Sequence, residues 1–364
     1  MEARPARAGR ARPVADWRSA DEPGGAVADE ETTAWGGELW AAADLVTPMA
    51  IRVAATLRLA DHIAAGRRTA RELAAAVQAD EDALDRVLRH LVTARVLTRA
   101  EPGAYGLTPL GEQLRDDDPR GLRPWLDLEG AVGRAETSFV QLLHTVRTGE
   151  PAFPQQFGRP FWDDLSADPA LAASFDALMG GRLGADAPEI ATAYPWGTLG
   201  HVVDVGGGTG TLLIAILRAH AGLRGTVVDL PGPAARAEAA FASAGLADRA
   251  TAHAGSFFDP LPAGAGGYVL SGVLHDWDDE GAGRILRRCV EAAPDTGRVL
   301  VVEDAIGADR DTPSTEGDLR MLCYVRGRDR TLDELAALAA RAGLDAGTVA
   351  PAGTRSIIEL LPRR

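Results

Sequence analysis

The sequence contains no lysine, so all 38 of its basic residues are arginine. This absence excludes two large enzyme classes, because a Walker A phosphate loop and a pyridoxal phosphate Schiff base both need a lysine side chain. Only two cysteines occur, Cys289 and Cys323, both in apolar contexts and far from a C-x-x-C spacing. We therefore expect no disulfide framework, zinc site or other metal site, and we predict that both cysteines are core residues.

Long apolar runs are also absent. No stretch of about 18 apolar residues occurs, and residues 1–18 are rich in arginine without an apolar segment. We therefore expect a cytoplasmic protein with no membrane partner. The formal net charge of −14 disfavours a nucleic-acid partner, because contact with phosphates needs a basic surface. With 364 residues, of which 46% are hydrophobic, the chain is long enough for two or more globular domains.

The N-terminal part is predicted to be helical and to end in a small β hairpin. Residues 1–33 lack apolar periodicity and are predicted to form a disordered leader. In residues 34–110, helical spacing separates Leu45, Met49, Val53, Leu57 and Ala60. Thr69 and Asp80 are predicted to begin two further helices, and strands at 96–98 and 105–107 follow. This outline also fits a winged-helix DNA-binding protein, an alternative that the acidic run Asp80–Asp82 disfavours.

Residues 111–195 are predicted to be mostly helical, with loops at 116–119, 149–160 and 180–184. The segment is rich in aromatic side chains. These side chains either line an aromatic pocket or form a helical core, and the sequence leaves both interpretations open.

From residue 196 to residue 364, predicted strands and helices alternate. The strands are 201–205, 225–229, 250–254, 268–272 and 298–303, and the helices are 210–220, 233–244, 280–293 and 331–342. Repeated strand-helix-strand units predict an α/β fold with a doubly wound parallel sheet, whose ligands lie at the carboxyl ends of the strands.

A glycine-rich loop, Gly206–Gly210, follows the first of these strands. Glycine lets the backbone approach a ligand closely and adopt positive φ, which is typical of a nucleotide-type cofactor site. The spacing is G-x-G-x-G, whereas the NAD fingerprint is G-x-G-x-x-G, so an NAD-dependent oxidoreductase is disfavoured. Asp204 before the loop and Asp229 at the end of the next strand instead favour S-adenosylmethionine.

One histidine is a candidate general base. His275 lies in the loop directly after the strand 268–272, where α/β enzymes place catalytic groups. Glu303, at the end of the next strand, could orient its ring, and so could Asp329. Glu303 is the better candidate, because Asp329 sits among three arginines and could pair with them instead.

Together these segments resemble the class I S-adenosylmethionine-dependent O-methyltransferases of small molecules, including plant caffeate-type and actinobacterial antibiotic-tailoring enzymes. The resemblance spans about residues 40–362, and it is carried by Leu45–Ala50, Phe161–Leu165, Asp204–Gly210, Leu274–Glu280 and Asp318–Leu322. It implies a Rossmann-like, mostly parallel sheet, an N-terminal winged-helix-like dimerisation domain and a homodimer. The implied reaction is methylation of a phenolic hydroxyl on an aromatic natural product, of polyketide or anthraquinone type. Relatives that act as hydroxylases, decarboxylases or pericyclases leave a non-methylating alternative open.

The resemblance also implies roles for individual residues. His275, Glu303 and Asp329 match the catalytic positions. The expected cofactor contacts are Asp204, Gly206, Gly208, Gly210, Asp229, Leu230, Gly255, Ser256, Phe257, Phe258, Ser271 and Trp277. The expected substrate contacts are Phe139, Leu143, Phe157, Phe161, Trp162, Met179, Asp276 and Met321. Many relatives have an acid at the position of Ser256, so the hydrogen bond to the adenine amino group is in question there.

Overall fold

The computed structural model describes residues 37–101, 103–304 and 315–363, and the chain divides into two units, Met1–Met49 and Ala50–Arg364. In the first unit, helix α2 (Gly37–Ala43) is followed by the start of α3 (Val46–Thr56). The leader predicted at 1–33 lies outside the described residues. Within the described residues, no helix is both long and apolar enough to cross a membrane.

The second unit begins with the predicted helices and hairpin. After α4 (Leu59–Ala64) come α5 (Ala70–Val77) and α6 (Glu81–Thr93), followed by the antiparallel pair β1 (Leu97–Glu101) and β2 (Ala104–Leu107). Both predicted helix starts are confirmed: Thr69 forms a capping box with Glu72, and the Asp80 side chain accepts a hydrogen bond from the Ala83 amide. The two basic residues in α6, Arg86 and Arg89, pair with acids of the same helix.

The middle segment is more helical than predicted. It contains η1 (Gly111–Leu114), α7 (Arg123–Leu126), α8 (Ala131–Glu136), η2 (Thr137–Gln141), α9 (Leu142–Thr148), α10 (Ala152–Phe157), α11 (Phe161–Ala167) and α12 (Pro169–Ala193). The loop predicted at 116–119 is confirmed, but the loop at 149–160 contains α10 between two left-handed glycine caps, Gly149 and Gly158.

The prediction of a loop at 180–184 is wrong, because these residues lie in the middle of the 25-residue helix α12. The helix passes close to the glycine-rich loop, at ordinary contact distances that would also admit alanine. A Cβ atom at Gly180 would lie 3.5 Å from Oγ1 of Thr211 and 3.8 Å from Oγ1 of Thr209. The domain boundaries expected after residues 110 and 195 stay predictions.

A seven-stranded sheet with the order β5-β4-β3-β6-β7-β9-β8 forms the C-terminal part. Five strands are parallel: β3 (His201–Val205), β4 (Arg224–Asp229), β5 (Ala250–Ala254), β6 (Gly267–Ser271) and β7 (Arg298–Asp304). They confirm the predicted strands. The sheet continues with an antiparallel hairpin, β8 (Leu344–Ala352) and β9 (Arg355–Pro362), that the sequence did not predict.

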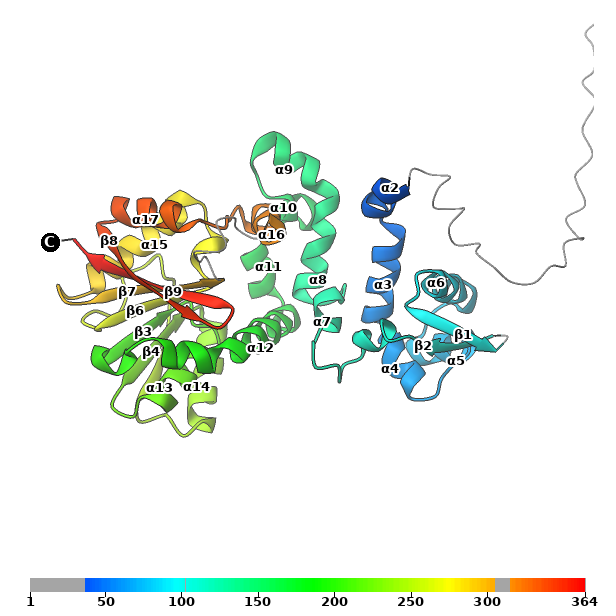
Figure 1. The fold of residues 1–364 in the computed structure, drawn as a ribbon, viewed down its shortest axis with the longest axis horizontal. Helices are drawn as coiled ribbons and strands as arrows, with labels where there is room; N and C mark the ends of the chain where they lie inside the picture. Colours follow the sequence, from blue (N-terminus) through cyan, green and yellow to red (C-terminus); the bar gives the residue numbers. More distant parts are fainter. Residues whose placement is uncertain (1–36, 102, 305–314, 364) are drawn as a thin grey trace, which may run out of the picture. The chain divides into compact units, whose positions relative to one another are not determined.

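Helices cover both faces of this sheet (Figure 1). On one face lie α13 (Thr211–Ala219), α14 (Pro231–Ser243) and the C-terminal half of α12, and on the other lie α15 (Asp279–Ala292) and α17 (Leu332–Arg341). The remaining elements are η3 (Trp196–Leu199), η4 (Leu274–Asp276) and α16 (Thr315–Val325). Both cysteines are buried and free, which confirms their assignment to the core. This arrangement brings the carboxyl ends of β3, β4, β6 and β7 to one edge of the sheet, where the site lies.

Candidate active site

The glycine-rich loop after β3 has a backbone that only glycine fits. Gly206 and Gly210 adopt positive φ, 74° and 79°. A Cβ atom at Gly206 would lie 2.9 Å from the Val273 side chain, and one at Gly210 would lie 2.6 Å from the Phe241 ring. The loop is therefore packed directly against its neighbours at these two glycines, whereas a Cβ atom at Gly208 would meet no atom within 4 Å.

Asp204 lies beneath this loop. A Cβ atom at Gly207 would be 2.7 Å from Oδ2 of Asp204, so Gly207 is needed for space although its φ is ordinary. Asp204 is 1% exposed, and among the described residues neither of its carboxylate oxygens has a hydrogen-bond partner. Burial and the nearby Asp229 raise the pKa of Asp204 to about 7. Gly207 packs directly on this carboxyl group, and a cofactor contact of Asp204 stays a prediction.

Asp229, at the end of β4, is bound by two backbone amides. Gly208 donates to its Oδ2 at 2.8 Å and Leu230 donates to its Oδ1 at 2.7 Å. Burial raises the pKa of Asp229, and the two amide hydrogen bonds oppose this effect. Each carboxylate oxygen keeps a lone pair, so the group can still accept bonds from two hydroxyls. Leu230, the N-cap residue of α14, is exposed.

An aromatic cluster lies next to the loop after β5. The rings of Phe257, Phe258 and Trp277 pack edge to face, with centroids 4.7 to 5.8 Å apart. Nε1 of Trp277 and Oγ of Ser271 are buried and have no hydrogen-bond partner among the described residues. A pocket of about 330 Å³ adjoins this cluster and is lined by Phe258, Trp277, Asp278, Glu280, Gly281, Arg284, Val325 and Arg326. Unpaired donors beside apolar rings suit a heteroaromatic ligand.

The loop between β5 and this cluster also positions Gly255 and Ser256. The Gly255 amide donates to the Asp229 carbonyl at 2.9 Å, which ties the loop to the end of β4. Oγ of Ser256 accepts a hydrogen bond from the Phe258 amide at 3.2 Å. The hydroxyl proton of Ser256 remains available, whereas an acid at this position would offer a ligand only acceptor oxygens.

His275 contacts one of its two predicted partners. After β6, Gly272 turns the chain with a φ of 64°, and the 3₁₀ turn η4 carries His275. Nδ1 of His275 lies 2.6 Å from Oε2 of Glu303, and Nε2 lies 3.4 Å from Oδ1 of Asp276. The His275 side chain is 30% exposed, so its ring is accessible to a substrate.

The charges around His275 favour its protonated form. Burial lowers the pKa of His275, but the carboxylates of Glu303, Asp276 and Asp329 outweigh this effect and raise it to about 10. Burial also raises the pKa of Asp276, to about 6, although the neighbouring histidine opposes the shift. The site thus holds one imidazole among three carboxyl groups.

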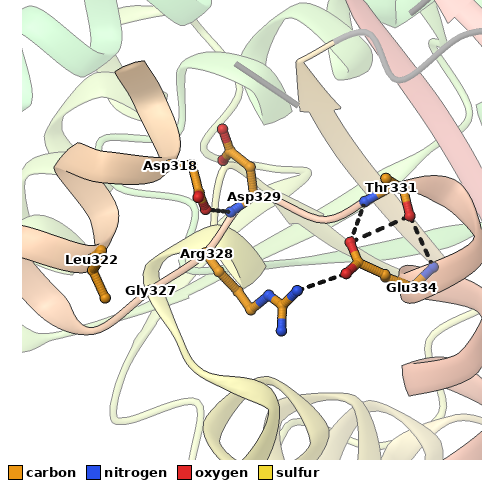
Figure 2. Close-up of a pocket in the computed structure, with 7 residues that line it drawn as sticks. All are labelled: Asp318, Leu322, Gly327, Arg328, Asp329, Thr331 and Glu334. Atoms are coloured by element: carbon orange, nitrogen blue, oxygen red, sulfur yellow. Dashed lines mark hydrogen bonds and ion pairs between the residues drawn. The ribbon is translucent and has the colours of Figure 1, made fainter. Parts of the chain in front are cut away.

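Asp329 does not pair with its neighbouring arginines. Within the described residues, Arg326 pairs with Glu150 and Asp278, Arg328 with Glu334 and Arg330 with Asp279. Figure 2 shows the Arg328 guanidinium extending toward Glu334 and the Asp329 carboxylate pointing the other way. The arginine-pairing alternative is therefore wrong, and burial raises the pKa of Asp329. The backbone of this loop lines a second pocket of about 330 Å³.

The aromatic side chains of the middle segment form a core. Phe161 is 5% exposed, and its ring contacts those of Phe153, Trp162, Phe175 and Tyr324 at centroid distances of 5.0 to 6.1 Å. The core interpretation therefore holds for Phe161, and a direct substrate contact does not fit its burial.

The other expected substrate contacts are spread over several elements. Phe139, Phe157 and Met321 are partly buried against this core, and Met179 is partly buried on α12. Leu143, on α9, is 60% exposed. The structure thus brings together His275, Glu303 and Asp276, and the substrate contacts of these five side chains and of Trp162 stay predictions.

Comparisons with known proteins were made for the whole chain. A model of the O-methyltransferase domain matches residues 139–345, and a model of the O-methyltransferase dimerisation domain matches residues 40–116. The chain belongs to the O-methyltransferase family. This O-methyltransferase is 58% identical over 322 residues to 2,7-dihydroxy-5-methyl-1-naphthoate 7-O-methyltransferase of Streptomyces carzinostaticus, covering 88% of this chain and 96% of that protein.

Two further relatives are informative. This O-methyltransferase is 50% identical over 322 residues to aclacinomycin 10-hydroxylase RdmB of Streptomyces purpurascens, covering 86% of this chain and 85% of that protein. Among solved structures, NcsB1 from neocarzinostatin biosynthesis, in complex with S-adenosylmethionine and 2-hydroxy-5-methyl naphthoic acid, matches with a TM-score of 0.86 and 57% identity. The match covers 89% of this chain and 98% of NcsB1. The family uses S-adenosylmethionine, as the glycine spacing predicted, and not NAD.

Proposed function

We propose that this O-methyltransferase methylates a phenolic hydroxyl of a fused-ring aromatic natural product similar to a hydroxynaphthoate, with His275 as general base. The observation that carries the proposal is the 2.6 Å contact between Nδ1 of His275 and Oε2 of Glu303, at the edge of the sheet where the glycine-rich loop also lies. The naphthoate named for the 58% identical relative supports the substrate class.

The residues around the glycine-rich loop suit S-adenosylmethionine. The loop backbone has close-packed glycines, Asp229 has free lone pairs for two ribose hydroxyls, and Trp277 offers an indole N–H that has no partner in the described part of the chain. We propose that these groups, with Ser271 and the aromatic cluster, hold the cofactor. When bound, S-adenosylmethionine supplies an electrophilic methyl group.

His275 removes the phenolic proton in this proposal. Glu303 accepts the hydrogen bond from Nδ1–H, so the lone pair of the neutral ring lies on Nε2, where the substrate hydroxyl takes the place beside Asp276. When Nε2 takes the proton, Glu303 faces an imidazolium and stabilises it. The oxygen that remains is a phenolate, a stronger nucleophile than the phenol.

The raised pKa of His275 matches this task. A phenol has an ordinary pKa of about 10, close to the value of about 10 at His275. Proton transfer between groups of equal pKa is nearly balanced in free energy, so little of the barrier is spent on it. The cost is that the neutral, reactive form of His275 is a minority at neutral pH.

Labelled cofactor tests the proposal. The protein is incubated with S-adenosylmethionine carrying a deuterated methyl group and with a hydroxynaphthoic acid, and the product is examined by mass spectrometry. We expect a product that carries the label, and we expect His275→Ala to lower kcat by at least about tenfold while cofactor affinity stays nearly unchanged. The matched control is His201→Ala, because His201 lies at the start of β3, on the opposite edge of the sheet. Near-wild-type turnover by His275→Ala would remove His275 as the base.

A hydroxylase is the second candidate, because the 50% identical relative is named a 10-hydroxylase. In that case the cofactor remains in the site and its methyl group is not transferred. A product that contains new oxygen and no deuterated methyl group would support this candidate and contradict methyl transfer. The His275–Glu303 pair favours methylation, because a reaction without phenol deprotonation does not need it.

We propose that a second copy of the chain covers an apolar surface of the first unit. Leu39, Trp40, Leu45, Val46 and Met49 are 39% to 78% exposed. All but Leu39 lie within the match to the dimerisation domain, and two of them belong to the predicted apolar face. We expect analytical ultracentrifugation to find a homodimer, and Leu45→Asp to shift it toward monomer. Leu110→Asp, at another exposed leucine, is the control, and a monomeric wild-type protein would contradict the proposal. The cytoplasmic location stays a prediction.

A further inference from the structure

The turn that carries His275 is short and weakly bonded. The 3₁₀ helix η4 has three residues, and it follows Gly272 in the left-handed region. Its backbone hydrogen bonds are long, 3.2 Å from the Asp276 amide and 3.3 Å from the Trp277 amide. So short a turn fixes few dihedral angles by itself, and the direction of the His275 ring depends on contacts from outside.

Arg330 supplies two of these contacts from the far side of the turn. Its Nη1 donates to the Leu274 carbonyl and its Nη2 donates to the Trp277 carbonyl, both at 2.8 Å. These two carbonyls flank His275 and Asp276 in the chain. Arg330 is only 5% exposed, and its Nε and Nη2 also contact Oδ1 of Asp279 at 3.1 and 3.0 Å. The planar guanidinium therefore holds three acceptors in one fixed geometry.

The loop before Arg330 is seated against the same turn. The Arg328 amide donates to the His275 carbonyl at 2.8 Å. A Cβ atom at Gly327 would lie 2.1 Å from that carbonyl oxygen, so the loop backbone touches the turn without an intervening side chain. The carbonyls of Leu274, His275 and Trp277 are all bound by residues 328–330.

We propose that Arg330 is a positioning residue for the methyl transfer, holding the turn so that His275 stays against Glu303. Arg330 does not touch the reacting atoms. The inference rests on the proposed role of His275, and its consequence is that kcat depends on a buried arginine on the far side of the turn.

Arg330→Lys is the informative variant, because lysine keeps the charge but cannot bind both carbonyls and Asp279 in one plane. We expect kcat to fall at least tenfold. The matched control is Arg341→Met, since Arg341 contacts the other oxygen of Asp279 at 3.1 Å from an exposed position and does not reach the turn. This control is expected to stay within twofold of the wild-type kcat.

A double-mutant cycle separates positioning from general destabilisation. If Arg330 acts through His275, Arg330→Lys lowers kcat by less than twofold in the His275→Ala background. Equal losses in both backgrounds, or an unchanged kcat for Arg330→Lys alone, would overturn the inference. If Arg330→Lys does not fold, Asp279→Asn is used instead, because it weakens the contact that Asp279 makes with the Arg330 guanidinium. An unchanged kcat for Asp279→Asn would also overturn the inference.

An NMR titration of the His275 ring makes the test independent of turnover. With the turn loosened and the charge retained, we expect Arg330→Lys to lower the proton affinity of His275 at least tenfold, because the contact with Glu303 opens. If His275→Ala keeps its activity and this shift still occurs, the proposed base is wrong and the positioning stands. If Arg330→Lys leaves the titration of His275 unchanged and His275→Ala is inactive, the positioning role of Arg330 is contradicted and the proposed base is not.

Discussion

Replacing Asp204 with asparagine is expected to make the protein more stable at alkaline pH. The carboxyl group of Asp204 is buried without a hydrogen-bond partner among the described residues, and burial together with Asp229 raises its pKa from 3.8 to about 7. Well below pH 3.8 the group is protonated in both the folded and the unfolded chain, so ionisation makes no difference to stability. As the pH rises from 3.8 to about 7, the unfolded chain ionises first and the folded chain loses stability.

The size of this effect follows from the two pKa values. At about 1.4 kcal/mol for each tenfold difference in proton affinity, the loss amounts to about 4 kcal/mol above pH 7. Asparagine does not titrate, so Asp204→Asn removes the loss. We expect the stability of the variant relative to wild type to improve by about 4 kcal/mol between about pH 4 and about pH 8.

Urea unfolding followed by circular dichroism at the two pH values measures this difference. Comparing the change with pH, rather than one absolute value, cancels the cost of burying the unpaired amide of asparagine. Asp248→Asn, on an exposed loop, is the control and is expected to show no such change. A difference between Asp204→Asn and wild type that is the same at both pH values would refute the reasoning, because the carboxylate would then be as stable inside the fold as in water.

Three further predictions concern the site. Gly207→Ala is expected to weaken S-adenosylmethionine binding at least tenfold by calorimetry, because its Cβ would meet the Asp204 carboxylate. The control is Gly222→Ala, where a Cβ meets no atom within 4 Å, and it should leave binding unchanged. Equal cofactor affinities for the two variants would contradict the need for glycine at position 207. The value of kcat/KM for the acceptor is expected to rise with pH toward about 10, where His275 loses its proton. Glu303→Gln should move this rise to lower pH. A kcat/KM that does not change above pH 7 would exclude a His275 base with a raised pKa. The stability that His275 gains from its carboxylates is fully present below pH 6.5 and is lost as the pH rises through about 10, so wild type should lose more thermal stability than His275→Ala between pH 7 and pH 10.

Much of the fold could be predicted because its signals are local. The starts of α5 and α6 follow from capping residues whose hydrogen bonds span three positions, at Thr69 and Asp80. Of the five parallel strands, β3, β4, β6 and β7 follow from short apolar runs, whereas β5 has only one buried residue. Strand β8 has no such run: most of its residues are exposed, and it is placed by pairing with β9 at the edge of the sheet.

The parts of the site that depend on the chemistry of a single side chain could be predicted from the sequence. The parts that depend on how residues pack against one another could not. His275 follows β6 and Glu303 lies near the carboxyl end of β7, so their meeting at one sheet edge is a consequence of topology. The role of Gly207 depends on Asp204 lying beneath it, and its ordinary φ gives no signal of its own. Arg330 binds backbone carbonyls, which every residue has, so no sequence pattern marks its partners.

Helix α12 sets a condition for engineering new substrate preference. Its first part, through Leu171 and Phe175, belongs to the aromatic core of the middle segment, and its last part, through Ala187 and Ile190, belongs to the core beneath the sheet. A chimera that exchanges the middle segment with a relative cannot be joined inside this helix without mixing two packed interiors. A junction after Ala193 moves the last part of α12 as well, so the contacts of Ala187 and Ile190 with the core beneath the sheet must then be matched in the recipient.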